Sequence, residues 1–310
     1  MSMAAKYSDL IKLKAKALGF SACGITKARR LDEEEARLKA FLDQAYHGKM
    51  AYLANHFEKR LDPTQLVPGA KSVVVVLLNY FPDGFQQGID VPLISKYAYG
   101  KDYHLVIKEK LKELYNYIDT ELAPVNGRMF TDSAPVLERA WAVQAGLGWI
   151  GKNGLLLNRQ LGSFFFIAEL ILDLELEYDQ AYKKEHCGSC NQCLSACPTN
   201  ALVKPYVLDA RKCISYLTIE LKDEIPEAFR PKLMRRAFGC DICQDVCPWN
   251  QRPQSHHVKE FEPHSELLKM SKVDWQLLSK EKFNELFRYS AVKRAGYQKL
   301  KQNIKSIFDQ

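Results

Sequence analysis

The sequence lacks the features that would direct it into a membrane or out of the cell. No N-terminal stretch combines a basic region, an apolar core and a small-residue cleavage site, so we expect no signal peptide. The longest apolar runs, residues 73–78 and 164–172, are too short to span a bilayer, and Glu169 interrupts the second. Solenoid repeats and low-complexity segments are also missing. These absences predict a soluble, cytoplasmic, globular protein.

Cysteine is not scarce but is unevenly placed. Of the nine cysteines in 310 residues, Cys23 stands alone, and the other eight lie between Cys187 and Cys247. Because the cytosol keeps thiols reduced, such a concentration indicates metal ligands rather than disulfides. No histidine or run of cations lies near Cys23, so we expect a buried structural thiol there.

Hydrophobic patterning predicts a mixed domain of class α/β or α+β in about the first 180 residues. The polar stretch 179–185 marks its end, a segment rich in cysteine and poor in strands follows, and helical spacing returns from about residue 255. We therefore expect three units, at residues 1–180, 181–250 and 251–310. Within the first unit, helices are expected at 4–18, 31–46, 102–122 and 135–145, and strands at 71–80, 154–158 and 163–173.

The eight clustered cysteines have the spacing of two [4Fe–4S] ligand sets. The run from Cys187 to Pro198 has intervals of two, two and three residues, as in bacterial two-cluster ferredoxins, whose fourth cysteine ligates the other cluster. A second run from Cys240 to Pro248 repeats the end of this pattern. The crossover rule assigns Cys187, Cys190, Cys193 and Cys247 to the first cluster, and Cys197, Cys213, Cys240 and Cys243 to the second.

Two other interpretations of the cysteines stay open. Zinc also binds paired CxxC units, although zinc ribbons rarely use a CxxCxxC run that ends in Cys-Pro. A protein with two clusters can also be a pure electron carrier. The roughly 180 residues upstream are more than a carrier needs, so we expect a group there to receive the electrons.

Three upstream motifs do not indicate the functions that their sequences suggest. Residues 146–151 match GxGxxG, but they follow a helical pattern and precede a strand, which predicts a tight turn rather than a dinucleotide site. Asp102-Tyr103-His104 begins the D-x-H-x-x-G cobalamin motif, but Ile107 replaces its glycine, so we expect no cobalt-ligating histidine. His256-His257 is expected to be a solvated loop.

Asp132 is the best candidate for a general acid. It ends an apolar stretch and stands just before a predicted helix whose first turn contains Pro135. A carboxylic acid beside a large apolar cofactor keeps a raised pKa and can deliver a proton. The alternative is structural, because Asp-Ser-x-Pro is also a common helix start in which the carboxylate caps backbone N–H groups.

Five segments and the cysteine array, taken together, resemble one family. The segments are Lys59-Arg60 with 68–73 (PGAKSV), 97–104 (YAYGKDYH), 132–139 (DSAPVLER), 146–153 (GLGWIGKN) and 213–218 (CISYLT). They are similar to those of epoxyqueuosine reductases, cobalamin-dependent iron–sulfur enzymes that complete queuosine synthesis in tRNA. The resemblance covers about residues 50–250.

The resemblance implies a fold, cofactors and partners. The fold is a cobalamin-binding domain similar to flavin-dependent nitroreductases and cobalamin-processing proteins, joined to a ferredoxin-like double-cluster domain and a short helical C-terminal segment. Base-off cobalamin would lie between the first domain and the clusters, with Asp132 as proton donor. A low-potential flavodoxin or ferredoxin would supply electrons to a monomer that acts on tRNA. The implied cobalamin contacts are Arg60, Tyr97, Asp132, Leu156, Ile167 and Ser215.

The C-terminal region departs from the family pattern. Many members continue into a helical-repeat domain that helps to hold the tRNA, whereas this sequence ends at Gln310. Residues 230–310 contain 16 Lys or Arg against 9 Asp or Glu, which is either an ordinary solvated surface or a surface for a polyanion. We expect Lys293 and Arg294 to contribute to tRNA binding.

Three rival functions follow from the same features. A corrinoid reductive dehalogenase shares the cofactors but is typically exported behind a twin-arginine signal, which this sequence lacks. A two-cluster electron carrier would bind no corrinoid. A corrinoid-processing enzyme would need no ferredoxin module.

Overall fold

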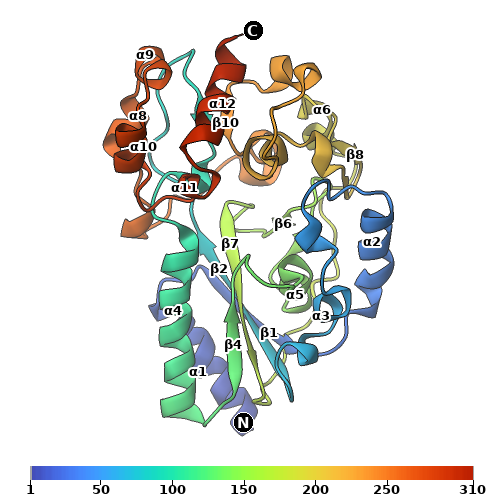
Figure 1. The fold of residues 1–310 in the computed structure, drawn as a ribbon. Helices are drawn as coiled ribbons and strands as arrows, with labels where there is room; N and C mark the ends of the chain where they lie inside the picture. The colour runs from blue at the N-terminus through green and yellow to red at the C-terminus, as the bar shows by residue number, and fades with distance from the viewer. Residues whose placement is uncertain (1, 310) are drawn as a thin grey trace.

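A computed structural model describes residues 2–309 and shows a sheet domain below a helical lobe rich in cysteine (Figure 1). The sheet has four strands in the order β1-β2-β7-β4, and each neighbouring pair is antiparallel. The domain is therefore of the α+β class, since its sheet contains no parallel pair. The strands are β1 (Ala22–Lys27), β2 (Ser72–Asn79), β7 (Phe165–Leu172) and β4 (Gly127–Phe130).

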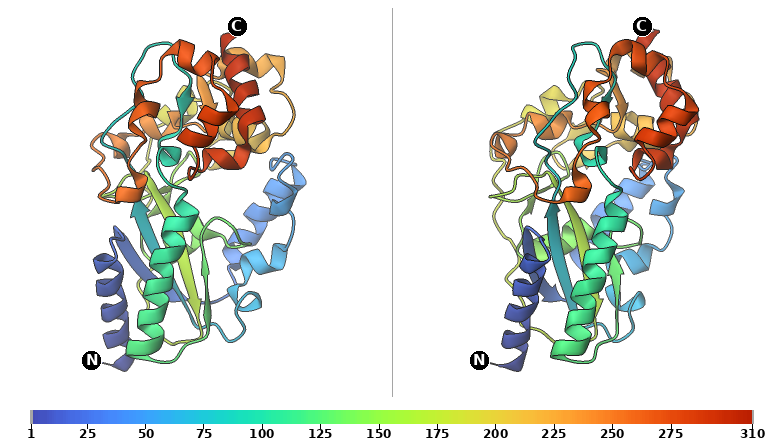
Figure 2. Two further views of the ribbon diagram at one scale, coloured as in Figure 1. Left: turned by 60° about the vertical axis from the view of Figure 1, so that its left-hand side comes forward. Right: turned by 90° about the vertical axis from the view of Figure 1, so that its left-hand side faces the viewer.

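Helices cover both faces of this sheet. On one face, α1 (Met3–Ala17) and α4 (Tyr103–Tyr117) run side by side over alternate residues of β2 and β7 (Figure 2). The opposite face packs against α5 (Glu138–Gln144), whose Trp141 is buried with Val75. Burial on both faces explains why β2 and β7 read as continuous apolar runs in the sequence.

The upper lobe has a hydrophobic core drawn from distant parts of the chain. β3 (Leu93–Ile94) pairs in parallel with β10 (Arg236–Phe238), and α12 (Tyr297–Phe308) packs against β10. Residues 91–99, 210–238 and 267–307 share this core. The segment between β2 and α4 thus belongs to the upper lobe, although the strands and helices that flank it belong to the sheet domain.

The remaining elements are short. The helices are α2 (Asp32–Asp43), α3 (Phe57–Leu61), α6 (Gln192–Ala196), α7 (Ile242–Asp245), α8 (Ser265–Lys269), α9 (Lys272–Gln276), α10 (Lys280–Leu286) and α11 (Val292–Ala295). The strands are β5 (Trp149–Ile150) with β6 (Leu156–Leu157), and β8 (Leu202–Lys204) with β9 (Val207–Leu208). Single π-helical turns occupy Ile118–Leu122 and Tyr216–Glu220. Within residues 2–309, no helix is both long and apolar enough to cross a membrane.

Most of the predicted elements are confirmed, with three corrections. The helix expected at 135–145 begins only at Glu138, because residues 132–137 form a loop. Strands β1 and β4 were not expected, since both are short and weakly patterned. His256 is buried rather than solvated, and burial lowers the pKa of its imidazole; His257 is exposed as expected.

The glycines at 146–151 form the predicted tight turn between α5 and β5. Gly146 has a φ of +76°, and a Cβ on Gly148 would lie 2.0 Å from the carbonyl oxygen of Leu157. Backbone therefore occupies the space that a dinucleotide phosphate would need, in agreement with the prediction. Cys23 is partly buried, and burial raises the pKa of its thiol to about 12, so it stays protonated.

Candidate active site

The site is built around Asp132, in the loop between β4 and α5. Its backbone is left-handed, with a φ of +47°, and its side chain is 63% exposed. The preceding Thr131 is fully buried, and its hydroxyl donates to the carbonyl oxygen of Ile167 at 3.2 Å. The residue that caps α5 is Leu137, without a side-chain hydrogen bond. The helix-capping interpretation of Asp132 is therefore wrong.

Two side chains fix the position of this loop. The phenol of Tyr103 donates to Oδ2 of Asp132, and the N–H of Asp132 donates to the carboxylate of Glu138. Tyr103 stands in the first turn of α4, with its ring stacked on Phe166 at 4.1 Å between centroids. Burial and the charge of Asp132 raise the pKa of Tyr103, so its phenol stays a donor at neutral pH.

His104 links Asp132 to the C-terminal helices. Its Nε2 lies 3.9 Å from Oδ2 of Asp132, while its Nδ1 lies 2.8 Å from the carboxylate of Asp102, which caps α4. The guanidinium of Arg294, from α11, lies 3.0 Å from both ring nitrogens. A ring that donates through Nδ1 to Asp102 can accept from Arg294 only at Nε2. His104 is therefore held by Asp102 and Arg294 beside Asp132.

Two more carboxyl groups, those of Glu138 and Glu169, lie within electrostatic range of Asp132. Neither was predicted to be functional. Glu138 opens α5, and burial together with the charge of Asp132 raises its pKa to about 8. Glu169 lies at the centre of β7 with no exposed surface. Burial, followed by the charges of Glu138 and Asp132, raises the pKa of Glu169 well above its ordinary value. The sequence marked Glu169 only as a charged residue within the apolar run 164–172.

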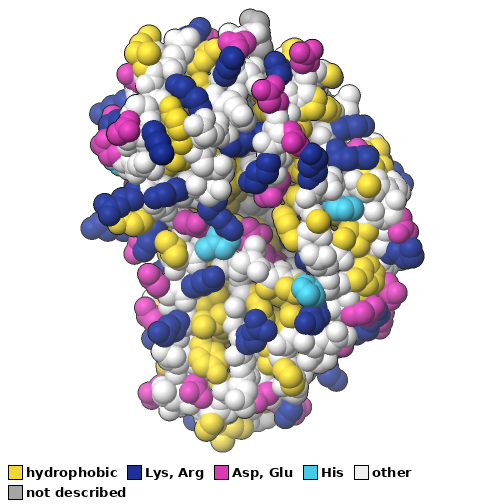
Figure 3. Space-filling model, viewed as in Figure 1, with side chains coloured by type: hydrophobic (Ala, Val, Ile, Leu, Met, Phe, Trp, Pro, Cys, Tyr) yellow, Lys and Arg dark blue, Asp and Glu magenta, His cyan; other side chains and the backbone are white. Residues whose placement is uncertain are grey.

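A hollow opens between the two lobes, with Lys and Arg side chains along its upper rim (Figure 3). The charges that act on the phenol of Tyr52 show which segments of the chain lie near one another. Burial and the charges of Glu220 and Asp132 raise the pKa of its phenol to about 12, while the charges of Arg60 and Arg294 act in the opposite direction. Residues from four separate segments thus lie within electrostatic range of this one phenol.

The implied cobalamin contacts differ in accessibility. Tyr97, Ile167 and Ser215 are half-buried, whereas Arg60 is 8% exposed and donates to the carbonyl oxygens of Tyr52 and Asn55. Leu156 is only 2% exposed, so it offers a ligand little surface. Tyr97 packs edge-on to Tyr103 and lies within range of the charge of Asp132. A half-buried apolar and neutral polar surface beside Asp132 fits a large ring with amide arms.

Electrostatic interactions link the eight clustered cysteines. Cys193 lies within range of Cys187 and Cys247, and Cys247 within range of Cys190. Cys213 lies within range of Cys197, and Cys240 within range of Cys213, while Cys243 lies within range of Cys240, Cys213 and Cys193. No three Cys, His, Asp or Glu side chains within residues 2–309 converge as ligands of a single metal ion do. A [4Fe–4S] cubane takes its four thiolates on four different irons, so its ligands need not converge on one point.

Hydrogen bonds already favour thiolate in the second group. Burial acts to raise the pKa of Cys197, but donors from Thr199 and from the N–H groups of Leu202 and Ala201 lower it below its ordinary value. The N–H of Ala201 lies 3.3 Å from Sγ of Cys197. The assignment of ligands to each cluster remains a prediction.

Lys152 and Asn153 connect the sheet domain to the cysteine loops. The ammonium of Lys152 donates to the carbonyl oxygens of Gly188 at 2.6 Å and Cys190 at 2.9 Å, and the amide of Asn153 donates to that of Cys243 at 3.4 Å. Both residues end the segment 146–153, and no role was predicted for either. They contact one loop from each predicted cluster.

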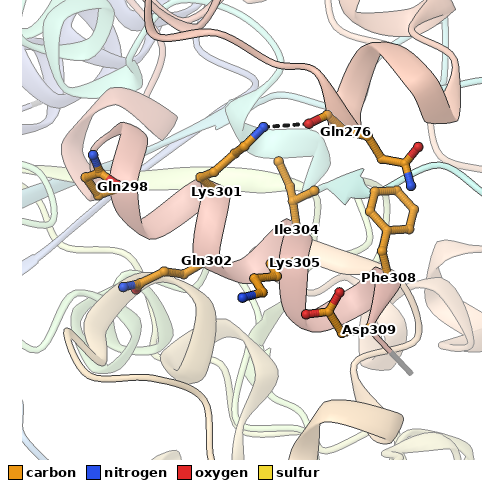
Figure 4. Close-up of a pocket in the computed structure, with 8 residues that line it drawn as sticks. All are labelled: Gln276, Gln298, Lys301, Gln302, Ile304, Lys305, Phe308 and Asp309. Atoms are coloured by element: carbon orange, nitrogen blue, oxygen red, sulfur yellow. Dashed lines mark hydrogen bonds between the residues drawn. The ribbon is translucent and has the colours of Figure 1, made fainter.

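A shallow groove on the surface of α12 lies apart from these groups (Figure 4). Its lining is mostly amide and ammonium side chains, and Lys301 donates to the backbone carbonyl of Gln276 across it at 2.6 Å. It contains no cysteine, and its one acid, Asp309, stands at the end of the helix. We assign it no role in the reaction.

Together, the fold, the thiol groups and the loop that carries the acid define an oxidoreductase with a double-cluster iron–sulfur module. Residues 186–250 match the family described as "4Fe-4S double cluster binding domain". Residues 60–133 match "Epoxyqueuosine reductase QueG, DUF1730". An epoxyqueuosine reductase of Cellulophaga algicola is 54% identical over 304 residues, covering 98% of this chain and 99% of the relative. One of Escherichia coli is 44% identical, covering 93% and 76%. The chain belongs to the epoxyqueuosine reductase family.

Solved structures agree with this assignment. The crystal structure of an epoxyqueuosine reductase with an epoxyqueuosine-modified tRNA-Tyr stem loop has a TM-score of 0.90 at 31% identity, covering 97% of this chain and 80% of that one. A Bacillus subtilis epoxyqueuosine reductase with its catalytic aspartate loop swung out of the active site has a TM-score of 0.89 at 31% identity, covering 97% and 81%. A catabolic reductive dehalogenase, at 16% identity and a TM-score of 0.50, shares the fold alone.

Proposed function

We propose that this chain reduces epoxyqueuosine in tRNA to queuosine, with electrons that pass through two [4Fe–4S] clusters to a cobalamin in the hollow between the lobes. The observation that carries the proposal is the placement of Asp132, an exposed carboxyl on a loop fixed by Tyr103 and Glu138, with His104 and its partner Arg294 beside it. Membership of the family supplies the substrate class. We expect a cytoplasmic monomer served by a flavodoxin or ferredoxin of low potential.

Different residues of the chain have different roles in the reaction. Asp132 delivers a proton to the oxygen that leaves the substrate, since a departing alkoxide is a poor leaving group until it is protonated. Tyr103 orients that carboxyl through its hydrogen bond to Oδ2. The guanidinium of Arg294, which donates to Nε2 of His104, places positive charge near it. Cobalamin, when bound, would supply the low-valent metal that carries out the reduction.

The cofactors would be held by the predicted side chains. Arg60, Tyr97, Asp132, Leu156, Ile167 and Ser215 would contact cobalamin. Cys187, Cys190, Cys193 and Cys247 would hold the first cluster, and Cys197, Cys213, Cys240 and Cys243 the second. The two thiol groups and the half-buried surface of the hollow support these assignments.

The test is anaerobic reconstitution with iron, sulfide and cobalamin, followed by assay on tRNA that carries epoxyqueuosine, with a low-potential reductant. Cobalamin-dependent formation of queuosine is the expected result. Clusters and cobalamin bound without conversion would contradict the substrate assignment, and clusters without cobalamin would favour an electron carrier. Asp132→Ala should keep both cofactors and lose most turnover, by about 100-fold or more. Near-normal turnover would remove Asp132 from the role of acid.

A further inference from the structure

The reaction needs more protons than Asp132 can carry. When the epoxide becomes an alkene, both C–O bonds break, a C=C bond forms, and the oxygen leaves as water. Each turnover therefore takes up two electrons, which the clusters supply under the proposed function, and two protons. Asp132 holds one proton at a time, so it must be protonated again, by solvent or by another group, before the oxygen leaves as water.

Glu169 has no structural role that accounts for it. It is fully buried at the centre of the sheet, opposite Val75 of β2 and Phe130 of β4. Neither of its carboxyl oxygens has a hydrogen-bond partner within residues 2–309. A carboxyl in such surroundings opposes folding unless it is neutral, because the charged form cannot be solvated. An apolar side chain of similar size would pack there without that cost.

Glu138 lies within electrostatic range of Glu169 and contacts the loop that carries the reacting carboxyl. Its Oε1 accepts the backbone N–H of Asp132, and α5, which it opens, packs across β7, the strand of Glu169. The charged groups that face this pair are Asp132 from the loop and Arg139 from α5. From α4, Tyr103 lies within range of the charge of Glu138 and donates to Asp132, and His104 lies 3.9 Å from Asp132.

We propose that Glu138 and Glu169 store protons and reload Asp132 during each turnover, so that the chain carries three carboxyl groups in series from the buried sheet to the hollow. This inference rests on the proposed function. Both residues act through Asp132 and do not touch the substrate. Burial and the charges of neighbouring carboxylates raise the pKa of Glu138 and of Glu169. Both residues therefore hold protons at neutral pH, at which an exposed carboxyl is ionised.

The first test uses the purified chain alone. Infrared spectra at neutral pH should show the carbonyl stretch of protonated carboxylic acids, which is separate from carboxylate bands. Glu169→Gln should remove part of this signal, and Glu138→Gln another part. Glu175→Gln, an exposed change shortly after the same strand, should leave it intact. Absence of the band in the unaltered chain, or its survival in both variants, would overturn the proposal.

The second test uses the reconstituted enzyme and tRNA that carries epoxyqueuosine. Glu169→Gln should lower the steady-state rate about tenfold, make it fall as pH rises, and allow partial rescue by small acidic buffers. Thermal melting establishes that this variant, which conserves volume, is folded. Rates and pH profiles equal to those of the unaltered enzyme would refute proton storage. If the unaltered enzyme makes no queuosine, the proposed function fails, and the infrared result still reports on the two carboxyls.

Discussion

Replacing Tyr103 by phenylalanine isolates the hydrogen bond that holds the reacting carboxyl. The ring is 8% exposed and stacks on Phe166 at 4.1 Å with an angle of 9°, and phenylalanine retains that contact. The change removes only the hydroxyl that donates to Asp132. Its effect on turnover therefore measures how far this donor positions the acid.

The expected loss of turnover depends on how exposed Asp132, the acceptor of this hydrogen bond, is to water. A hydrogen bond to a charged group contributes about 1.5–3 kcal/mol. Because the Asp132 side chain is 63% exposed, water can replace part of the lost donor, and the lower end of that range applies. At about 1.4 kcal/mol for each factor of ten, we expect turnover to fall roughly tenfold. Cofactor content should stay unchanged.

The assay is single-turnover conversion of tRNA by the reconstituted enzyme. Tyr115→Phe is the matched control, since its hydroxyl donates to the carbonyl oxygen of Val125 at 2.8 Å near the other end of α4. This control should lose some stability and no turnover beyond the scatter of the assay. If the two variants convert equally well, the hydrogen bond from Tyr103 does not position the acid.

Four further changes test other parts of the structure. Lys152→Met removes the ammonium that braces the first cysteine loop, so iron and sulfide content should fall towards that of one cluster; full loading would show that the loop needs no brace. In Glu138→Gln, a group whose pKa is raised from 4.5 to about 8 is lost. A carboxyl whose pKa is raised in the folded state destabilises that state at any pH where the unfolded chain ionises it more readily. The free energy of unfolding of the unaltered chain should therefore fall, relative to that of this variant, between about pH 4.5 and about pH 8. Urea-unfolding free energies that change with pH in the same way in both proteins would contradict this. Lys293→Ala should weaken tRNA binding and reduce its salt slope by about one, whereas Arg294→Ala should also lower turnover through His104; identical phenotypes would refute the distinction.

Local patterns were enough to predict the long elements and the double-cluster region at residues 186–250. β2 and β7 are continuous apolar runs because both of their faces are buried, and α4 begins where Asp102 caps it. The intervals between cysteines are set by the geometry of their ligands, so they could be recognised without any knowledge of the fold. β4 gave no such signal, since its four residues depend on pairing with β7.

The start of α5 could not be predicted, because contacts distant in sequence decide it. Pro135 favours a helical first turn, but Tyr103 and Glu138 hold Asp132 in a left-handed conformation that no regular helix permits. The same contacts turn a residue that resembles a helix cap into an exposed acid. Glu169 was visible as an interruption, but its relation to Asp132 depends on how β7 and α5 pack.

The parallel pairing of β3 with β10 constrains the order in which the chain can fold. Leu93 pairs with Arg236, so the cysteine run that begins at Cys187 lies inside a long loop closed by this contact. Closing a loop of that length costs entropy before the shared core repays it, which favours late formation of the upper lobe. A fragment that ends before the cysteines would leave Val91 and Ile94 without their core partners. Cluster insertion should therefore be studied on the intact chain, where both ends of the loop are secured.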